Sequence, residues 1–160
     1  WLDPLNPKNY DAIGGSYQLA QGNFGLAHGS LLGSGLGGGL PQLVPLAESD
    51  FIFSSLGEEL GLAGVFVLLL MYLLLVSRGI RIGFTHSDDF SKLLASGLSF
   101  VLALQTFIVV GGVTRVVPLT GLTTPFLAAG GSSLVANWII VGLLLRISDS
   151  AGGAQRTVTL

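Results

Sequence analysis

The sequence predicts an all-α integral membrane protein: three transmembrane helices, preceded by a large extracytoplasmic loop with a short amphipathic helix. Two observations carry this prediction. Of the 160 residues, 10% are charged and 50% are hydrophobic, whereas a soluble domain carries about 25% charged residues. Three long stretches also lack any charged side chain. This composition argues against a soluble domain and against a disordered chain, and the net charge of −2 argues against a nucleic-acid partner.

Each uncharged stretch supplies one predicted span. The stretches contain 18, 22 and 30 residues, at positions 60–77, 93–114 and 116–145, and a transmembrane helix needs about 20. Pro118 and Pro125 interrupt the first half of the last stretch, so its helix is expected to begin near residue 129. The predicted spans are residues 56–78, 91–115 and 129–147, within a membrane region of residues 55–148.

Positive charges predict the orientation of these spans, because Lys and Arg beside a span are retained on the cytoplasmic side. Five of the seven cations lie between the first two spans or after the third: Arg78, Arg81, Lys92, Arg146 and Arg156. The segment 1–54 and the loop 116–128 are then extracytoplasmic. Residues 149–160 are expected to form a cytoplasmic tail.

The extracytoplasmic segment contains the predicted amphipathic helix and a glycine-rich stretch. Apolar residues recur at steps of three and four, at Tyr17, Ala20, Phe24, Ala27 and Leu31. This helix either lies on the membrane surface or packs on the spans. Glycines at positions 33, 35, 37, 38 and 39 allow positive φ angles and a close approach to a lipid headgroup or a sugar. A plain flexible turn is the alternative.

Four acidic residues of interest lie before or at the start of the first span. Ser55 and Glu58 match a capping box, and Glu58 with Glu59 would complement the helix dipole. Asp50 precedes this box among apolar neighbours. It is either an N-cap or a carboxylate in a partly desolvated pocket, where its pKa would rise toward that of a useful general base. Glu48 is its acidic neighbour in the sequence.

A series of motifs then follows in the order found in one family. The motifs are Tyr17-Gln18 with Gln21, the glycine stretch to Gly39, Ser49-Asp50-Phe51-Ile52-Phe53, Gly57-Glu58-Glu59-Leu60-Gly61, Pro118-x-Thr120-Gly121-Leu122, Pro125-Phe126 and Gly130-Gly131-Ser132-Ser133. This series resembles the SEDS family, which includes FtsW, RodA and SpoVE, from Trp1 to about Ser148. The resemblance implies that the chain is the last large external loop and the final three spans of one larger SEDS domain. A first residue of Trp instead of Met fits that expectation.

The resemblance implies a peptidoglycan glycosyltransferase of the bacterial cytoplasmic membrane, acting in cell-wall elongation or division. Its substrate would be lipid II, a disaccharide-pentapeptide on undecaprenyl diphosphate, and its partner a class B penicillin-binding protein. The Asp that the family needs for polymerisation maps onto Asp50, which would deprotonate the acceptor sugar hydroxyl. No cofactor is implied with certainty, although a divalent cation could neutralise the leaving diphosphate. The isolated chain is expected to have little activity.

Further residues are candidates for substrate contacts on the outer side of the membrane. They are Glu48, Gln18, Gln21, Gly35, Gly37, Arg115, Ser132 and Ser133. Glu48 stands where the family pattern has another residue, since Pro-Glu-Ala-His-Thr-Asp is replaced by Pro-Leu-Ala-Glu-Ser-Asp. Arg115 would bind either the diphosphate or an ordinary lipid phosphate. Ser132 and Ser133 either permit close helix packing or line a cavity.

Two other functions stay open. A transporter that flips lipid-linked precursors needs polar residues along the spans, where the sequence offers Gln105, Thr106 and Asn137. Gln105 and Asn137 are expected to hydrogen-bond neighbouring helices, with substrate contact as the alternative. A non-catalytic scaffold for a class B penicillin-binding protein would tolerate loss of Asp50. The two histidines, His28 and His86, are isolated in the sequence, and no metal site is predicted from them.

Overall fold

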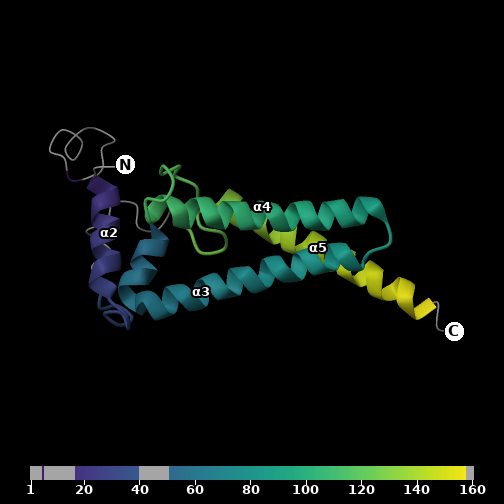
Figure 1. Cartoon of the computed structure of the whole chain (residues 1–160), viewed down its shortest axis with the longest axis horizontal. Coiled ribbons are helices and arrows are strands. Elements are labelled where there is room, and N and C mark those ends of the chain that lie inside the picture. The colour runs from purple at the N-terminus through teal and green to yellow at the C-terminus, as the bar shows by residue number, and fades with distance from the viewer. Residues whose placement is uncertain (1–4, 6–16, 40–50, 158–160) are drawn as a thin grey trace.

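The computed structural model describes residues 5, 17–39 and 51–157, with side chains as far as Ala151. Its helices are α2 (Tyr17–Gly29), α3 (Ile52–Thr85), α4 (Asp89–Val113) and α5 (Gly131–Thr157). The three long helices run along the molecule, and α2 lies across one end of them (Figure 1). The described residues contain no strand, and the predicted all-α fold class is confirmed.

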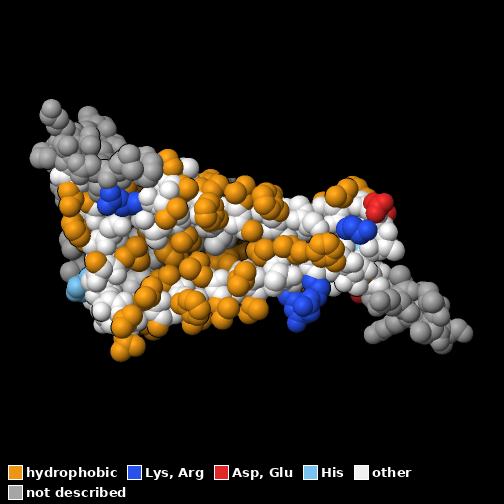
Figure 2. Space-filling view, in the orientation of Figure 1, with side chains coloured by type: hydrophobic (Ala, Val, Ile, Leu, Met, Phe, Trp, Pro, Cys, Tyr) orange, Lys and Arg blue, Asp and Glu red, His pale blue; other side chains and the backbone are white. Residues whose placement is uncertain are grey.

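Three of these helices are long and apolar enough to cross a membrane. They are α3 with 34 residues, α4 with 25, and the 21 residues Gly131–Ala151 of α5. Large apolar side chains are exposed along all three, including Phe66, Phe107 and Trp138, and Figure 2 shows them over the length of the bundle. Exposed side chains of this kind fit a lipid environment, where apolar surface carries no penalty. The prediction of three spans is therefore confirmed.

Helices α3 and α4 pack closely because small residues line their contact. A Cβ atom on Gly79 would lie 2.1 Å from the Ser99 Oγ, and one on Gly83 would lie 2.6 Å from the Ser96 Oγ. Such small pairs let two helix backbones approach in a membrane. The turn between the helices ends at Asp88, whose carboxylate accepts a hydrogen bond of 2.9 Å from the Ser91 amide and caps α4.

Helix α3 begins earlier than its predicted capping box. Phe51 is the N-cap, no side chain caps the helix, and Ser55 lies within the helix. The capping-box prediction is wrong, and so is the placement of Glu58 in the first turn. The reason is tertiary: Phe51 and Phe53 are 1% and 2% exposed, so burial of these rings places the helix start a turn earlier.

A sharp bend then divides α3 at Gly61, which has φ 68° and ψ −173°. A residue with a side chain rarely adopts this conformation, whereas glycine does so at little cost. The segment 52–60 therefore points away from the axis of the following span, as Figure 1 shows beside α2.

The predicted helix around residues 17–31 is present as α2, but its packed face differs from the predicted stripe. The buried residues are Leu19, Ala20, Gly22, Gly25 and Gly29. Phe24 and Leu31, from the predicted stripe, are 51% and 67% exposed. The three buried glycines leave room for α3, since a Cβ on Gly22 would lie 2.7 Å from the Phe51 ring. Helix α2 packs against α3, as one of the two predicted alternatives requires.

Candidate functional site

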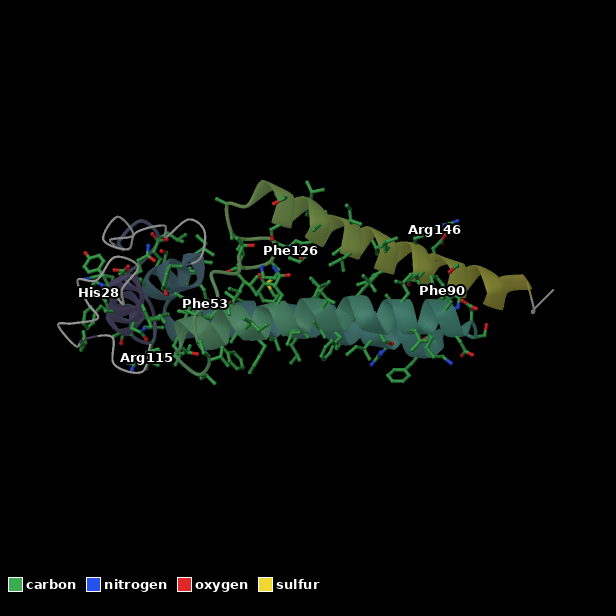
Figure 3. The ribbon with its side chains drawn as sticks, turned by 90° about the horizontal axis from the view of Figure 1, so that it is seen from above. His28, Phe53, Phe90, Arg115, Phe126 and Arg146 are labelled. Atoms are coloured by element: carbon green, nitrogen blue, oxygen red, sulfur yellow. The ribbon has the colours of Figure 1, made fainter. Side chains whose placement is uncertain are left out.

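One end of the molecule carries a compact assembly of three segments, which we call the platform: α2, the glycine loop 30–39 and residues 51–63 of α3. Figure 3 shows His28, Phe53 and Arg115 at this end, and Phe90 and Arg146 at the other. The platform contains four of the residues that the sequence nominates: Gln18, Gln21, Gly35 and Gly37.

The glycine loop replaces two hydrogen bonds that the bend at Gly61 removes from α3. In a regular helix, the amides of Leu62 and Ala63 would bond the carbonyls of Glu58 and Glu59. Those carbonyls instead accept hydrogen bonds from the amides of Ser34 (2.9 Å) and Gly35 (3.0 Å). The two freed amides donate to the carbonyls of Ser30 (3.0 Å) and Leu31 (3.2 Å). The loop is thus joined to α3 through its backbone, and every freed group is paired.

This exchange brings backbones so close that glycine is required. A Cβ on Gly33 would lie 2.0 Å from the Glu59 carbonyl oxygen, and one on Gly61 would lie 2.3 Å from the Gly33 nitrogen. The predicted positive φ angles are confirmed at Gly33, Gly35 and Gly37, with values of 82°, 92° and 76°, but not at Gly38 and Gly39. The bulky group that the loop approaches is α3 itself. Gly35 and Gly37 differ, because a Cβ on either would meet nothing within 4 Å.

A buried carboxylate lies between α2 and α3. Glu58 is 5% exposed, and its Oε1 lies 3.2 Å from the Nδ1 of His28, whose side chain is 62% exposed. Gly25 and Gly39 make room for the carboxylate, since Cβ atoms on them would lie 3.4 Å and 3.3 Å from its Oε2. The sequence analysis missed this pair because the two residues are 30 positions apart. The spacing of Gly22, Gly25 and Gly29 was a signal that α2 has a close neighbour.

The other nominated residues lie as follows. Asp50 and Glu48 fall outside the described residues, and the next residue in the chain after Asp50 is the buried Phe51. Gln18 and Gln21 are half-buried on α2. Arg115 follows α4 directly, is half-buried, and has a φ of 65°. Gln18 and Gln21 therefore belong to the platform, and Arg115 lies at the same end of the molecule.

Ser132 and Ser133 lie apart from the platform, in the first turn of α5. Ser132 is exposed. The Ser133 hydroxyl accepts a hydrogen bond of 2.8 Å from Thr123 Oγ1 and a longer one, 3.4 Å, from Asn137 Nδ2. These contacts connect the loop 116–128 to α5.

Two polar side chains hold the same loop against the other spans. The Tyr72 hydroxyl of α3 donates a hydrogen bond to the Pro125 carbonyl, and Gln105 Nε2 of α4 donates one of 3.0 Å to the Thr123 carbonyl. Beside them, Phe126 and Trp138 meet edge to face with ring centroids 5.8 Å apart. These rings border an apolar hollow of about 370 Å³ that also contacts Leu68 and Met71 of α3.

The described residues offer no candidate metal site. No group of three or more His, Cys, Asp or Glu side chains comes together there.

Comparisons with known proteins identify a family and several relatives of this chain. A family described as cell cycle protein, covering FtsW, RodA and SpoVE, matches residues 1–152. The chain is 51% identical to the peptidoglycan glycosyltransferase RodA of Mycobacterium bovis, over 98% of this chain and 33% of that protein. It is 39% identical to the probable peptidoglycan glycosyltransferase FtsW of Geobacter metallireducens, over 96% of this chain and 39% of that protein.

Two solved structures share the fold. A mutant of the rod shape determining protein RodA from Thermus thermophilus matches 76% of this chain and 39% of its own, with a TM-score of 0.64 and 34% identity. A chain of a peptidoglycan synthase complex, described for its coordination of polymerization and crosslinking, matches 94% of this chain and 40% of its own. Its TM-score is 0.72 and its identity 28%.

The chain spans about a third of the length of the first of these curated relatives. Its three membrane-spanning helices, together with the bacterial relatives, identify a protein of the bacterial inner membrane. The match over residues 1–152 and the identity to RodA and FtsW agree with the motif series read from the sequence. The chain belongs to the SEDS family of FtsW, RodA and SpoVE.

Proposed function

We propose that this chain is the C-terminal part of a peptidoglycan glycosyltransferase that polymerises lipid II into β-1,4 glycan strands. The observation that carries the proposal is the 51% identity, over 98% of the chain, to a protein named peptidoglycan glycosyltransferase RodA. The rest of the enzyme, including the other walls of the substrate site, would come from the part of the domain that the relatives have in addition.

Asp50 is the proposed general base. Its carboxylate takes the proton of the acceptor sugar's 4-hydroxyl as that oxygen forms a bond to the anomeric carbon of the donor. The bond from this carbon to the diphosphate breaks at the same time, and the diphosphate departs with the electron pair. Diphosphate needs no protonating acid, so one carboxylate suffices, with Glu48 as a neighbouring acid. Inversion at the anomeric carbon turns an α-linked donor into a β-linked product.

The platform supports this role through the rigidity of its backbone. Phe51, the residue after Asp50, is buried against α2, and the glycine loop is hydrogen-bonded to both sides of the bend at Gly61. A base gains from a fixed supporting structure because its orientation sets the rate of proton transfer. Gly35 and Gly37, which face open space, together with Gln18 and Gln21 of α2 would then contact the lipid-linked sugar.

A cationic side chain and an apolar hollow support two further parts of the proposal, the binding of the diphosphate and of the polyprenyl tail. Arg115, half-buried after α4, is the proposed partner of the diphosphate, with a divalent cation as a possible supplement. Ser132 and Ser133 at the start of α5 would border the lipid. The apolar hollow beside Phe126 and Trp138 would accept a segment of the polyprenyl tail, because its lining is almost entirely apolar.

The proposed orientation places the platform and residues 1–54 outside the membrane and the C-terminus in the cytoplasm. Arg78 and Arg81 lie in the last third of α3, and Lys92 lies in the first turn of α4. Figure 3 shows Arg146 at the end opposite the platform. This distribution fits retention of cations inside. A class B penicillin-binding protein is the proposed partner. The similarity to a chain of a peptidoglycan synthase complex supports it.

The test is lipid II polymerisation by the full-length protein in complex with its penicillin-binding protein. Asp50→Ala and Asp50→Asn are expected to lower the rate by at least about a hundredfold, the usual contribution of a general base. Asp149→Asn is the control, because this exposed carboxylate is paired with Arg146 far from the platform. Polymerisation at the wild-type rate by Asp50→Ala would contradict the proposal. If the protein moved lipid II across the membrane of liposomes that contain no other polymerase, the result would favour a transporter instead.

A further inference from the structure

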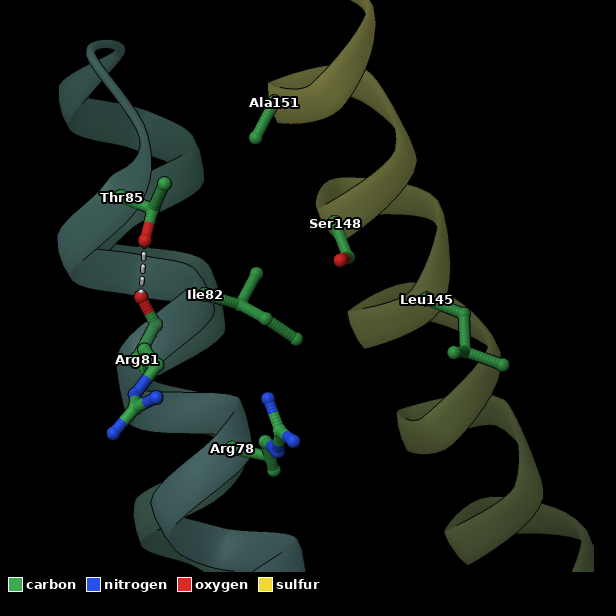
Figure 4. A pocket seen from close by; sticks show the side chains of 7 residues that line it. All are labelled: Arg78, Arg81, Ile82, Thr85, Leu145, Ser148 and Ala151. Carbon is green, nitrogen blue, oxygen red and sulfur yellow. Dashed lines mark hydrogen bonds between the residues drawn. The ribbon is translucent and has the colours of Figure 1, made fainter.

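A second cavity lies at the end of the bundle away from the platform, between α3 and α5. Its volume is about 490 Å³. Its walls include Arg78, Arg81 and Ile82 from α3 and Leu145, Ser148 and Ala151 from α5. In Figure 4, the Arg78 side chain extends into the space between the two helices, and the Ser148 hydroxyl lies on the opposite wall. The cavity thus combines cationic, polar and apolar groups.

The two arginines of this cavity lack an acidic partner among the described residues. They are three positions apart on α3 and both exposed, so their side chains lie on neighbouring parts of one helix surface. The acidic groups at this end are already engaged. Asp149 pairs with Arg146 at 3.3 Å, Asp89 pairs with Lys92 at 3.4 Å, and Asp88 caps α4 through Ser91. The cavity wall is therefore an uncompensated cationic surface.

The position of the cavity along α3 indicates what kind of anion it suits. Arg78 comes directly after the uncharged stretch 60–77, so its guanidinium lies where the hydrocarbon region gives way to the polar interface. Ile82 and Leu145 provide apolar walls at the same level. A soluble anion gains nothing from these apolar walls, whereas an amphiphile fills both parts of the cavity.

We propose that this cavity binds the phosphate group of an anionic membrane phospholipid. Arg78 and Arg81 contact the phosphate oxygens, the Ser148 hydroxyl donates a hydrogen bond, and the acyl chains follow the exposed apolar surface of α3 and α5. Guanidinium groups suit phosphate because they present several donors in one plane. The bound lipid fills the gap between the two helices at this end. This site is separate from the glycosyl transfer proposed at Asp50.

The test measures lipid binding to the full-length protein, delipidated in detergent and titrated with phosphatidylglycerol, phosphatidylcholine or inorganic phosphate. Native mass spectrometry counts bound lipid and yields apparent dissociation constants. We expect phosphatidylglycerol to bind more tightly than phosphatidylcholine and to resist competition by an excess of inorganic phosphate. The double variant Arg78→Gln/Arg81→Gln is expected to weaken phosphatidylglycerol binding about thirtyfold.

Two further variants test whether lipid binding depends on the cavity or only on the positive charge of this end of the molecule. Arg146→Gln removes a cation from the same end that does not line the cavity, and it should change the affinity less than about twofold. Ala151→Trp keeps both arginines but fills the cavity, and it should weaken binding as strongly as the double variant. Circular dichroism confirms that each variant is folded.

Three results would overturn the proposal. They are unchanged phosphatidylglycerol affinity in the double variant, equal affinity for phosphatidylcholine, and full displacement by inorganic phosphate. The last would show a site for free phosphate and not for a lipid. None of these results bears on polymerisation by the Asp50 variants, so failure of this proposal and failure of the proposed enzymatic function can be told apart.

Discussion

The platform and the opposite end of the bundle use different atoms to hold the same helix. At the platform, the backbone of the glycine loop hydrogen-bonds the backbone of α3 on both sides of Gly61. At the opposite end, α3 meets α4 through small side chains such as Ser99, and α5 through a cavity lined by side chains. A backbone contact admits no added atom, whereas a cavity tolerates changes in size and charge. The platform should therefore be sensitive to a side chain added at Gly33 or Gly61, and the cavity between α3 and α5 should be sensitive mainly in ligand binding.

The largest expected effect is on the platform itself. Gly61→Ala imposes a positive φ on a residue with a side chain and places its Cβ 2.3 Å from the Gly33 nitrogen. We expect a loss of about 3 kcal/mol in unfolding free energy or more, measured by reversible denaturation in detergent. Gly97→Ala on α4 is the matched control, because its Cβ would meet nothing within 4 Å. If both variants unfold alike, the backbone exchange does not hold the platform.

A smaller loss of unfolding free energy is expected for a change at Tyr72, which lies between the two ends and holds the loop 116–128. Tyr72→Phe removes the donor to the Pro125 carbonyl, and an unpaired buried carbonyl costs about 1 to 3 kcal/mol. Hydrogen exchange and denaturation in detergent measure the loosened loop. Ser77→Ala is the control, since this exposed hydroxyl bonds only the Leu74 carbonyl within its own helix. Equal losses in the two variants would rule out a special role for Tyr72.

The interaction between His28 and Glu58 should contribute less to the free energy of unfolding than the burial of Glu58 suggests. The His28 side chain is mostly exposed, so solvent screens the interaction. A double-mutant cycle with His28→Ala and Glu58→Gln should give a coupling free energy of about 0.5 kcal/mol. Glu58→Gln alone should cost more than His28→Ala alone, because Glu58 is the buried partner. A coupling free energy several times larger would contradict the prediction and would mean that the pair is a main contact between α2 and α3.

The smallest effect is expected at the opposite end, where Asp88 caps α4. The hydrogen bond from the Ser91 amide lowers the pKa of Asp88 below its ordinary value. The charged form is favoured in the folded state, so its stabilisation is complete above the unfolded pKa and is lost as the pH falls through the folded pKa. The protection factors of the first amides of α4, which are exchange rates corrected for the intrinsic effect of pH, should therefore fall in acid. Asp88→Ser keeps a cap without a titrating group and should remove this pH dependence. If the pH dependence persists in this variant, a group other than Asp88 causes it.

Much of the membrane architecture follows from the sequence because the length of an apolar stretch is a local property. The stretch 60–77 predicts a span whatever surrounds it, and the residue type permits the positive φ angles found at Gly33, Gly35 and Gly37. Family membership was likewise readable, since the motifs from Tyr17 to Ser133 occur in the family's order. These inferences needed no knowledge of which segments touch.

Tertiary packing decided the rest. Burial of Phe51 and Phe53 against α2 moved the start of α3 upstream of Ser55 and left Glu58 beside His28 instead of in the first turn. The packed face of α2 contains three glycines beside Leu19 and Ala20, because a close approach of two backbones leaves no room for a larger side chain at those three positions. Contacts between residues 30 positions apart depend on the path of the chain in space, and local periodicity carries no information about that path.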